Sequence, residues 1–234
     1  MMNPRRLRLF EEMLLLELDD DKGTTRADCW HKTEMGGAIL AELVLSGAIT
    51  ITDDKKKQVK LVPGAARPED LILAEALALI QESKKIRKAS DWVQKFAGLK
   101  DLKNRAARQL VAKGVLKEDT GKVLGIFKRT IYPEANPGPE QDLRRRLEGA
   151  IFMDQQEVDP ATTVVVALAR ATGLLDRVFT KKRLKPRKQR LEDLVNGNLA
   201  GKATREAVEA VQAAILVATI VPAIAASTTA ATSG

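Results

Sequence analysis

Hydrophobic positions recur along most of the chain at the three-to-four-residue spacing of an α-helix. Near the N-terminus, Leu7, Phe10, Met13, Leu14 and Leu18 share one helical face, which predicts a helix over about residues 6–18. The same spacing, with glycine and proline as end signals, predicts eight more helices. They cover about residues 31–45, 68–83, 90–97, 100–113, 140–153, 160–175, 187–195 and 202–226.

Two regions alternate between apolar and polar residues instead, which is typical of short strands. Residues 48–52 are expected to pair with residues 58–62 across a polar turn at 53–57. A second hairpin is expected within residues 115–132, around a turn at Asp119-Thr120-Gly121. The pattern therefore predicts a mainly α protein, a single globular multi-helix domain with two small β-hairpins, spanning residues 1–226.

The C-terminal region is the least polar part of the chain. Residues 213–226 carry no charge, but they are fewer than the roughly 20 apolar residues of a spanning helix and include Pro222. We expect a buried core helix there, followed by a disordered tail over residues 227–234. The basic start of the chain leads at once into Glu11 and Glu12, so no signal peptide is predicted.

Charge points to an anionic partner. Lys and Arg outnumber Asp and Glu by 39 to 31, which gives a net charge of +8. Nucleic acid and a negatively charged membrane both suit this balance. Aromatic residues make up only 3% of the chain, so Leu, Val, Ile and Ala must build the core, and these residues together favour helices over sheets.

Neither a metal site nor a catalytic centre is predicted. Cys29 is the single cysteine and His31 the single histidine. A single cysteine excludes an internal disulfide and a cysteine-based zinc site, and a lone thiol suits a reducing cytoplasm. We find no glycine-rich phosphate loop and no nucleophile or zinc-protease motif. Glu11 and Glu12 are expected to be exposed. We therefore expect a protein that is not an enzyme and needs no cofactor.

Four segments, in one order, resemble the Golgi phosphoprotein 3 family in its compact bacterial form. They read LFEEMLLLELDDDKG, GGAILAELVLSGAI, RQLVAKGVLKEDTGKVLGIFKRTIYP and VDPATTVVVALARATGLLDRVF, and the likeness extends over about residues 6–218. The resemblance implies a mainly helical, peripheral membrane protein on the cytosolic face of a membrane. Eukaryotic members recognise phosphatidylinositol 4-phosphate and act as adaptors for the cytosolic tails of glycosyltransferases, and the family is not known for catalysis.

The resemblance also implies a headgroup site. Lys100 and Lys103 stand where eukaryotic members have headgroup arginines, and Arg105 follows them. Three residues apart on a helix, the two lysines would converge on one anion, although lysine lacks the planar fork of arginine. The alternative is a solvated basic face.

The aromatic member of the family's pocket corresponds only approximately to Trp30. The segment around Trp30 aligns with a gap, and a half-buried core tryptophan is the alternative. A further family arginine corresponds to Gly36, for which Lys32 is a candidate substitute. These departures put specificity for phosphatidylinositol 4-phosphate in doubt and leave binding to anionic lipids intact.

Other basic segments leave other functions open. Residues 181–190 form the densest basic run, either a solvated connector or a second lipid contact, and residues 144–146 read as the polar face of a helix. Helix 100–113 and hairpin 115–132 could instead form a winged-helix-like unit that binds nucleic acid. The apolar hairpin residues, however, suit a lipid interface or a core contact better than a DNA wing. A protein adaptor without a lipid or nucleic-acid ligand is the third alternative.

Overall fold

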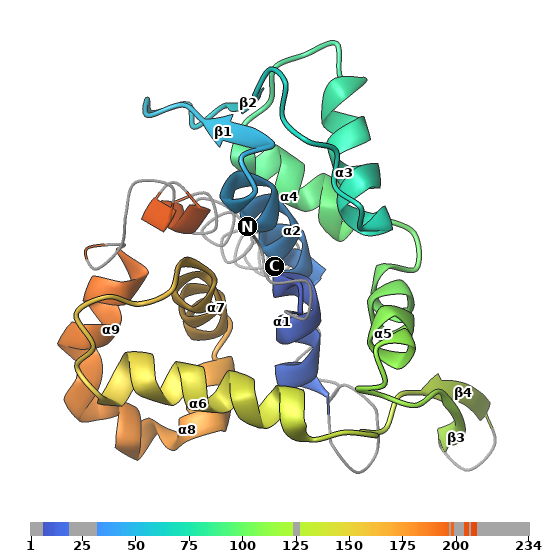
Figure 1. Cartoon of the computed structure of the whole chain (residues 1–234), viewed down its shortest axis with the longest axis vertical. Helices are drawn as coiled ribbons and strands as arrows, with labels where there is room; N and C mark the ends of the chain where they lie inside the picture. Colours follow the sequence, from blue (N-terminus) through green and yellow to red (C-terminus); the bar gives the residue numbers. More distant parts are fainter. Residues whose placement is uncertain are drawn as a thin grey trace, which may run out of the picture.

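The computed structural model describes residues 7–18, 32–123, 127–196, 198, 204–205 and 207–209. Within these residues the chain forms nine α-helices, one short 3-10 helix and two antiparallel strand pairs (Figure 1). The mainly α fold with two small hairpins is thereby confirmed. The helices are α1 (Leu9–Glu17), α2 (Lys32–Leu45), α3 (Leu71–Gln81), α4 (Ala89–Ala97), α5 (Leu102–Ala112), α6 (Gly138–Phe152), α7 (Pro160–Ala171), α8 (Leu174–Leu184), η1 (Lys185–Arg187) and α9 (Lys188–Val195). The strands are β1 (Ile49–Ile51), β2 (Val59–Leu61), β3 (Asp119–Val123) and β4 (Phe127–Ile131).

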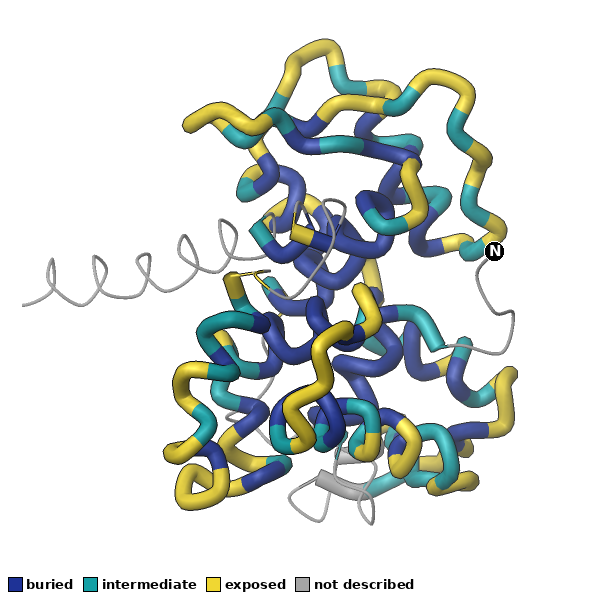
Figure 2. The backbone as a smooth tube through the Cα atoms, turned by 60° about the vertical axis from the view of Figure 1, so that its left-hand side comes forward, coloured by how far each residue is buried: buried dark blue, intermediate teal, exposed yellow. Residues whose placement is uncertain are grey.

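Helices α1 and α2 lie at the centre of the molecule, and α4, α5, α6 and α7 surround them (Figure 1). Every residue of α1 is buried, and so is α2 from Glu34 to Val44. A helix that is hydrophobic all round is expected in a protein interior. Figure 2 shows the same layering, with buried segments inside and exposed connections at the periphery.

The packing of α2 against α4 depends on Gly36. A Cβ atom there would lie 2.3 Å from the carbonyl oxygen of Val93 and 2.9 Å from the backbone nitrogen of Ala97. Any larger residue would push the two helices apart, because these neighbours are backbone atoms. This close approach brings Trp92 and Phe96 of α4 into the core, where both are buried.

The predicted helix starts are right at some positions and wrong at others. Helix α7 begins at Pro160, as predicted, and Asp159 caps it by accepting a hydrogen bond from Thr162 N at 2.9 Å. Helix α3 begins at Leu71 rather than Pro68, because Asp70 is its N-cap and accepts from the backbone of Ile72 and Leu73. Helix α4 begins at Ala89 with Lys88 as its N-cap, so Ser90, the first residue of the predicted helix, lies inside it.

Both hairpins form, with one correction. Strands β1 and β2 pair as expected, Ile49 opposite Leu61 and Ile51 opposite Val59. In the second hairpin, Asp119 pairs with Ile131 and Gly121 with Arg129. The predicted turn residues 119–121 are therefore part of β3, where Gly121 leaves room for the side chain of Ile131.

Some predictions lie outside the described residues. These are Cys29, Trp30 and His31, most of the final predicted helix at 202–226, and the tail at 227–234. The extent of a single domain over residues 1–226 stays a prediction. None of the helices in the described part of the chain is long and apolar enough to span a membrane.

Candidate anion-binding site

The start of α5 differs from the sequence prediction. The helix begins at Leu102, and its N-cap, Asp101, has a left-handed backbone with φ of 54°. Lys100 is exposed and precedes the helix. The helical spacing that was expected to bring Lys100 and Lys103 together therefore does not apply, because the left-handed residue Asp101 interrupts the helical geometry between them.

Lys103 lies in the first turn of α5 and is partly buried. Burial, which is the largest cause, and the positive charge of Arg129 on β4 together lower the pKa of its ammonium group to about 8, although the carboxylate of Glu17 on α1 acts in the opposite direction. Two cations from separate elements are thus close enough to repel each other. An anion bound beside Lys103 would offset the cost of keeping that charge partly buried.

Arg105 takes part in a different interaction. Its guanidinium lies 2.5 Å from Glu75 of α3 and 3.4 Å from the carbonyl oxygen of Lys100. The ion pair links α3 to α5, and Glu75 compensates the charge. Lys100, Lys103 and Arg105 thus share one short segment but differ in environment, and only Lys103 is held near a second cation by tertiary structure. Their role in binding stays a prediction.

The remaining expected members of the site are only partly described. Trp30 lies outside the described residues. Gly36 lies in the α2–α4 contact, so an arginine at this position would not fit the present helix spacing. Lys32, the candidate substitute, is the first residue of α2 and is exposed. The missing family arginine is therefore explained by the packing of the core.

The order of elements proposed for a nucleic-acid interface is present, since α4 and α5 precede the β3–β4 hairpin. The cations of α5, however, contact acidic residues. Arg108 lies 3.4 Å from Asp101 and 4.0 Å from Glu118, and Arg105 pairs with Glu75. These contacts leave less uncompensated positive charge on α5, the recognition helix of this alternative, than the sequence suggested.

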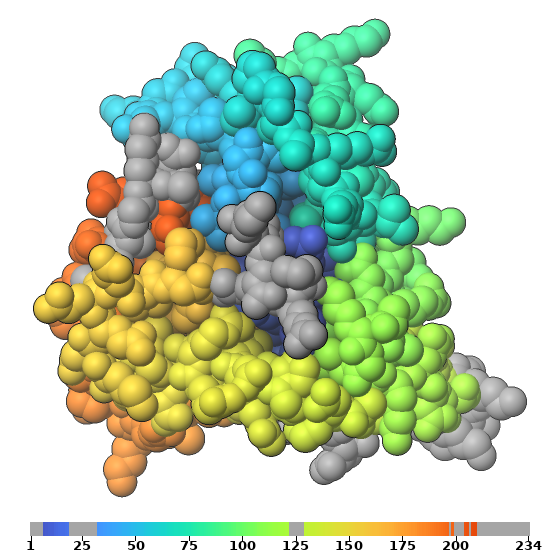
Figure 3. All heavy atoms as spheres, in the orientation of Figure 1, coloured from blue at the N-terminus to red at the C-terminus, as the bar shows by residue number. Residues whose placement is uncertain are grey.

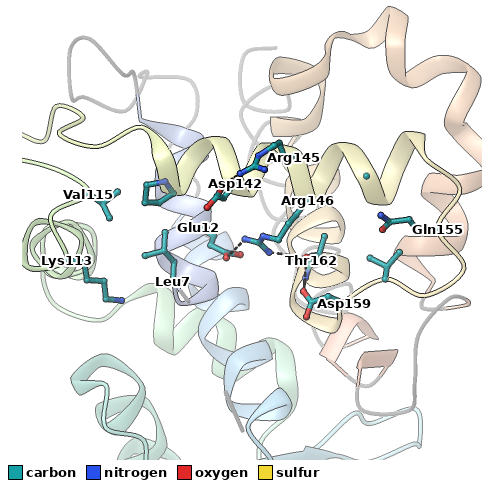
Figure 4. A pocket seen from close by; sticks show the side chains of 13 residues that line it. Leu7, Glu12, Lys113, Val115, Asp142, Arg145, Arg146, Gln155, Asp159 and Thr162 are labelled. Carbon is teal, nitrogen blue, oxygen red and sulfur yellow. Dashed lines mark hydrogen bonds and ion pairs between the residues drawn. The ribbon is translucent and has the colours of Figure 1, made fainter. Parts of the chain in front are cut away.

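A cavity of about 1070 Å³ is lined by both apolar and charged residues of α1, α6 and α7 and of the segments around them (Figure 4). Arg146 reaches across it and bonds to Glu12 at 2.5 Å and to the Thr162 hydroxyl at 3.0 Å. That hydroxyl donates to Asp159 at 2.7 Å. The cavity holds charge of both signs arranged in pairs, so it presents no cationic cluster of the kind expected for a phosphate.

Buried carboxylates are the feature that sequence reasoning missed. Glu11 and Glu12 were expected at the surface but are 0% and 1% exposed. Lys113 donates to Glu11 at 2.5 and 2.7 Å, yet burial is the larger effect and raises the pKa of Glu11. Burial likewise raises the pKa of Glu42, which accepts from the Leu9 amide at 2.8 Å. The apolar residues on all sides of Glu11 and Glu12 in the sequence were the available signal that these two carboxylates are buried.

No group of three or more potential metal-ligating side chains occurs among the described residues. A search of curated proteins finds no match to the chain. The family model described as Golgi phosphoprotein 3 (GPP34) matches residues 9–211, which is most of the chain and includes α1 to α9. The chain therefore belongs to the Golgi phosphoprotein 3 family.

Proposed function

We propose that this protein docks peripherally on the cytosolic face of a membrane by binding anionic lipid headgroups. Lys103 is the central contact, Lys100 and Arg105 are further contacts from the same segment, and Trp30 is the aromatic partner that the family resemblance implies. Phosphatidylinositol 4-phosphate is the headgroup suggested by family membership. The proposed role is binding rather than catalysis.

The observation that carries the proposal is the environment of Lys103. Burial and the charge of Arg129 lower the pKa of Lys103 to about 8, so keeping its ammonium group charged in the unliganded fold costs free energy, and the carboxylate of Glu17 offsets only part of this cost. Cations held in such a position become favourable when a phosphate neutralises them. By the family resemblance, the headgroup arginines of eukaryotic members correspond to Lys100 and Lys103, which supports the same segment as the physical argument does.

Membership of the family also supports a second role. We propose that the membrane-bound protein acts as an adaptor that holds cytosolic tails of membrane enzymes. Synthetic tail peptides should float with vesicles only when the protein is present. Failure of all tested tails would remove the adaptor role and leave the lipid-binding proposal intact.

Liposome flotation tests the lipid proposal. Purified protein is mixed with neutral vesicles, with phosphatidylserine vesicles and with charge-matched phosphatidylinositol 4-phosphate vesicles, each at low and high salt. A formed headgroup pocket predicts preference for the phosphoinositide and binding that persists in salt. Binding to every anionic vesicle that disappears in salt would indicate a basic surface without a pocket.

The decisive variant is Lys100→Glu with Lys103→Glu. Because each lysine near an anionic surface contributes about 1 kcal/mol, reversing both should weaken binding about tenfold or more. Lys103→Gln serves as a second variant, since a glutamate there would face Glu17. Lys181→Glu with Lys182→Glu on α8 is the matched control. Unchanged binding by the first variant would contradict the assigned site, and absence of wild-type flotation would contradict the membrane function.

A further inference from the structure

Two basic segments that are far apart in the sequence lie side by side at the upper end of the molecule in Figure 1. They are the turn and strand of the β1–β2 hairpin and the connection between α3 and α4. Val59 N donates to the carbonyl of Arg87 at 3.0 Å, and Ala89 N donates to the carbonyl of Lys57 at 2.9 Å. Between these bonds, Gln58 and Lys88 form an antiparallel bridge. The connection is thus fixed along the edge of β2.

This arrangement gathers exposed lysines that we call the hairpin–loop surface. Its members are Lys55, Lys56 and Lys60 from the hairpin and Lys84, Lys85 and Lys88 from the connection. Within the described residues, none of these side chains forms an ion pair. Lys57 differs, since it lies 2.6 Å from Glu209 and 3.4 Å from Asp53, and it is not counted as part of the surface.

Four acidic residues belong to the hairpin, the connection and the first turn of α4, and two of them bond to backbone. Asp54 accepts hydrogen bonds from the backbone of Lys56 and Lys57 and thereby shapes the turn. Asp91 accepts from the backbone of Lys88 at 3.4 Å. The others are Asp53 and Glu82. The six lysines of the hairpin–loop surface therefore outnumber these acidic residues. Their ammonium groups form no ion pairs within the described residues that would stabilise the fold.

Two exposed aliphatic side chains accompany the lysines. Ile86 is 66% exposed and lies between Lys85 and Arg87, and Leu61 at the end of β2 is 40% exposed. Figure 3 shows side chains of the α3–α4 connection projecting from the upper end of the molecule. A large aliphatic residue among lysines is costly in water but suits a bilayer interface, where ammonium groups meet headgroups and the apolar group enters the acyl boundary.

We propose that the hairpin–loop surface is a second membrane contact, in which its lysines bind anionic headgroups and Ile86 inserts below them. The proposal rests on the proposed function for its partner, an anionic bilayer, but uses different residues. Nucleic acid is a poorer fit, because recognition of bases draws on arginine, amide and aromatic side chains. Aliphatic Ile86 and Leu61 would gain nothing beside a phosphate backbone.

Three variants test the proposal by flotation with phosphatidylserine–phosphatidylcholine vesicles. Lys84→Glu with Lys85→Glu should weaken binding about tenfold or more, while Lys181→Glu with Lys182→Glu, an equal change of charge, serves as the control. Ile86→Ser should weaken binding about fivefold, and this loss should persist at high salt because no charge changes. Ile86→Trp should strengthen binding, because tryptophan favours the membrane interface. Thermal unfolding should be unaffected, since all three side chains are exposed.

The outcomes separate this proposal from the proposed function. If Lys84→Glu with Lys85→Glu binds like the control while Lys100→Glu with Lys103→Glu fails to bind, the headgroup site stands and the hairpin–loop surface is overturned. The reverse result supports the hairpin–loop surface and overturns the headgroup site. If Ile86→Ser has no effect on vesicles and the lysine variant loses only binding to a DNA duplex, the partner is nucleic acid and the proposal is wrong.

Discussion

The two most basic regions of the surface use their charge in opposite ways. The run at residues 181–190 is the densest in the sequence, yet its arginines contact other parts of the protein. Arg187 and Arg190 donate to the carbonyl oxygens of Ile151 and Ala150 at 2.8 and 3.0 Å. Arg183 lies 2.6 Å from Glu148. Most of the lysines on the hairpin–loop surface, by contrast, come from shorter clusters, and none makes an ion pair among the described residues.

This difference follows from the two side chains and from their positions. The carbonyls of Ala150 and Ile151 belong to the last turn of α6, where backbone acceptors have no helical partner. A guanidinium can donate several hydrogen bonds in one plane, which suits this cluster of carbonyls. Lysine has no such planar fork and stays hydrated at the surface. The density of charge in a sequence is therefore a poor guide to the charge available for a partner.

The largest expected effect tests whether the arginines of the 181–190 run are structural. Arg187→Ala with Arg190→Ala should lower the free energy of unfolding by about 3 kcal/mol, because two charge-assisted bonds to carbonyls are lost. For a protein of this size that corresponds to a decrease in Tm of about 6–12 °C. Urea unfolding would measure it.

The matched lysine variants provide the control for this experiment. Arg187→Lys with Arg190→Lys should recover only part of the stability, since lysine cannot bond to both carbonyls as a planar group. If the alanine variant unfolds at the same urea concentration as the wild type, the arginines are solvated and the contrast between the two basic regions disappears.

Lys103 shares a property with each of the two regions. Like Arg187 and Arg190 of the 181–190 run it is partly buried, and like the lysines of the hairpin–loop surface it is a proposed ligand contact. Its pKa of about 8 means that raising the pH from 7 to 9 removes most of its positive charge. The binding advantage of the wild type over Lys103→Gln on anionic vesicles should therefore fall from several-fold to nearly none across this range. Flotation at matched ionic strength would measure it, with Lys100→Gln as the control.

The same pKa fixes the sign of an effect on stability. The lysine pKa in the unfolded chain is about 10.5, so between pH 8 and 10.5 the unfolded chain binds more protons at this site than the folded protein. Raising the pH through this window should therefore stabilise the fold, and Lys103→Gln should remove that contribution. An identical pH dependence in wild type and variant would show that Lys103 is not buried as described.

Local patterns were sufficient to predict most of the architecture. The spacing of apolar residues predicted most of the helices, and alternation predicted the pairing of Ile49–Ile51 with Val59–Leu61. It missed α8 (Leu174–Leu184), because the prediction ended a helix at about residue 175 and read the basic run at 181–190 as a connector, whereas the structure is helical there. Errors occurred where a tertiary contact decides the outcome. The ladder between β3 and β4 places Gly121 within a strand, and the left-handed backbone of Asp101 separates Lys100 from α5. Neither contact leaves a periodic signal in its own segment.

The candidate site was less predictable for the same reason. The position of Lys103 could be taken from the family resemblance, but its proximity to Arg129 and Glu17 depends on three elements meeting. The burial of Glu11 and Glu12 depends on α1 being enclosed on all sides, for which the apolar residues around them in the sequence are the only local signal. The hairpin–loop surface was present in the sequence only as two unrelated clusters.

The smallest expected effect concerns the lysines within the 181–190 run. The Lys181 side chain is 84% exposed, and its nearest acid, Asp176, is 3.9 Å away. Because an exposed pair of this kind contributes little, Lys181→Glu with Lys182→Glu should change the free energy of unfolding by less than about 0.5 kcal/mol. Its binding to anionic vesicles should fall by no more than about threefold, from the change in net charge alone. A loss as large as that of Lys84→Glu with Lys85→Glu would mean that both regions contact the bilayer. The two regions would then differ in how much they contribute to the stability of the fold, but not in membrane binding.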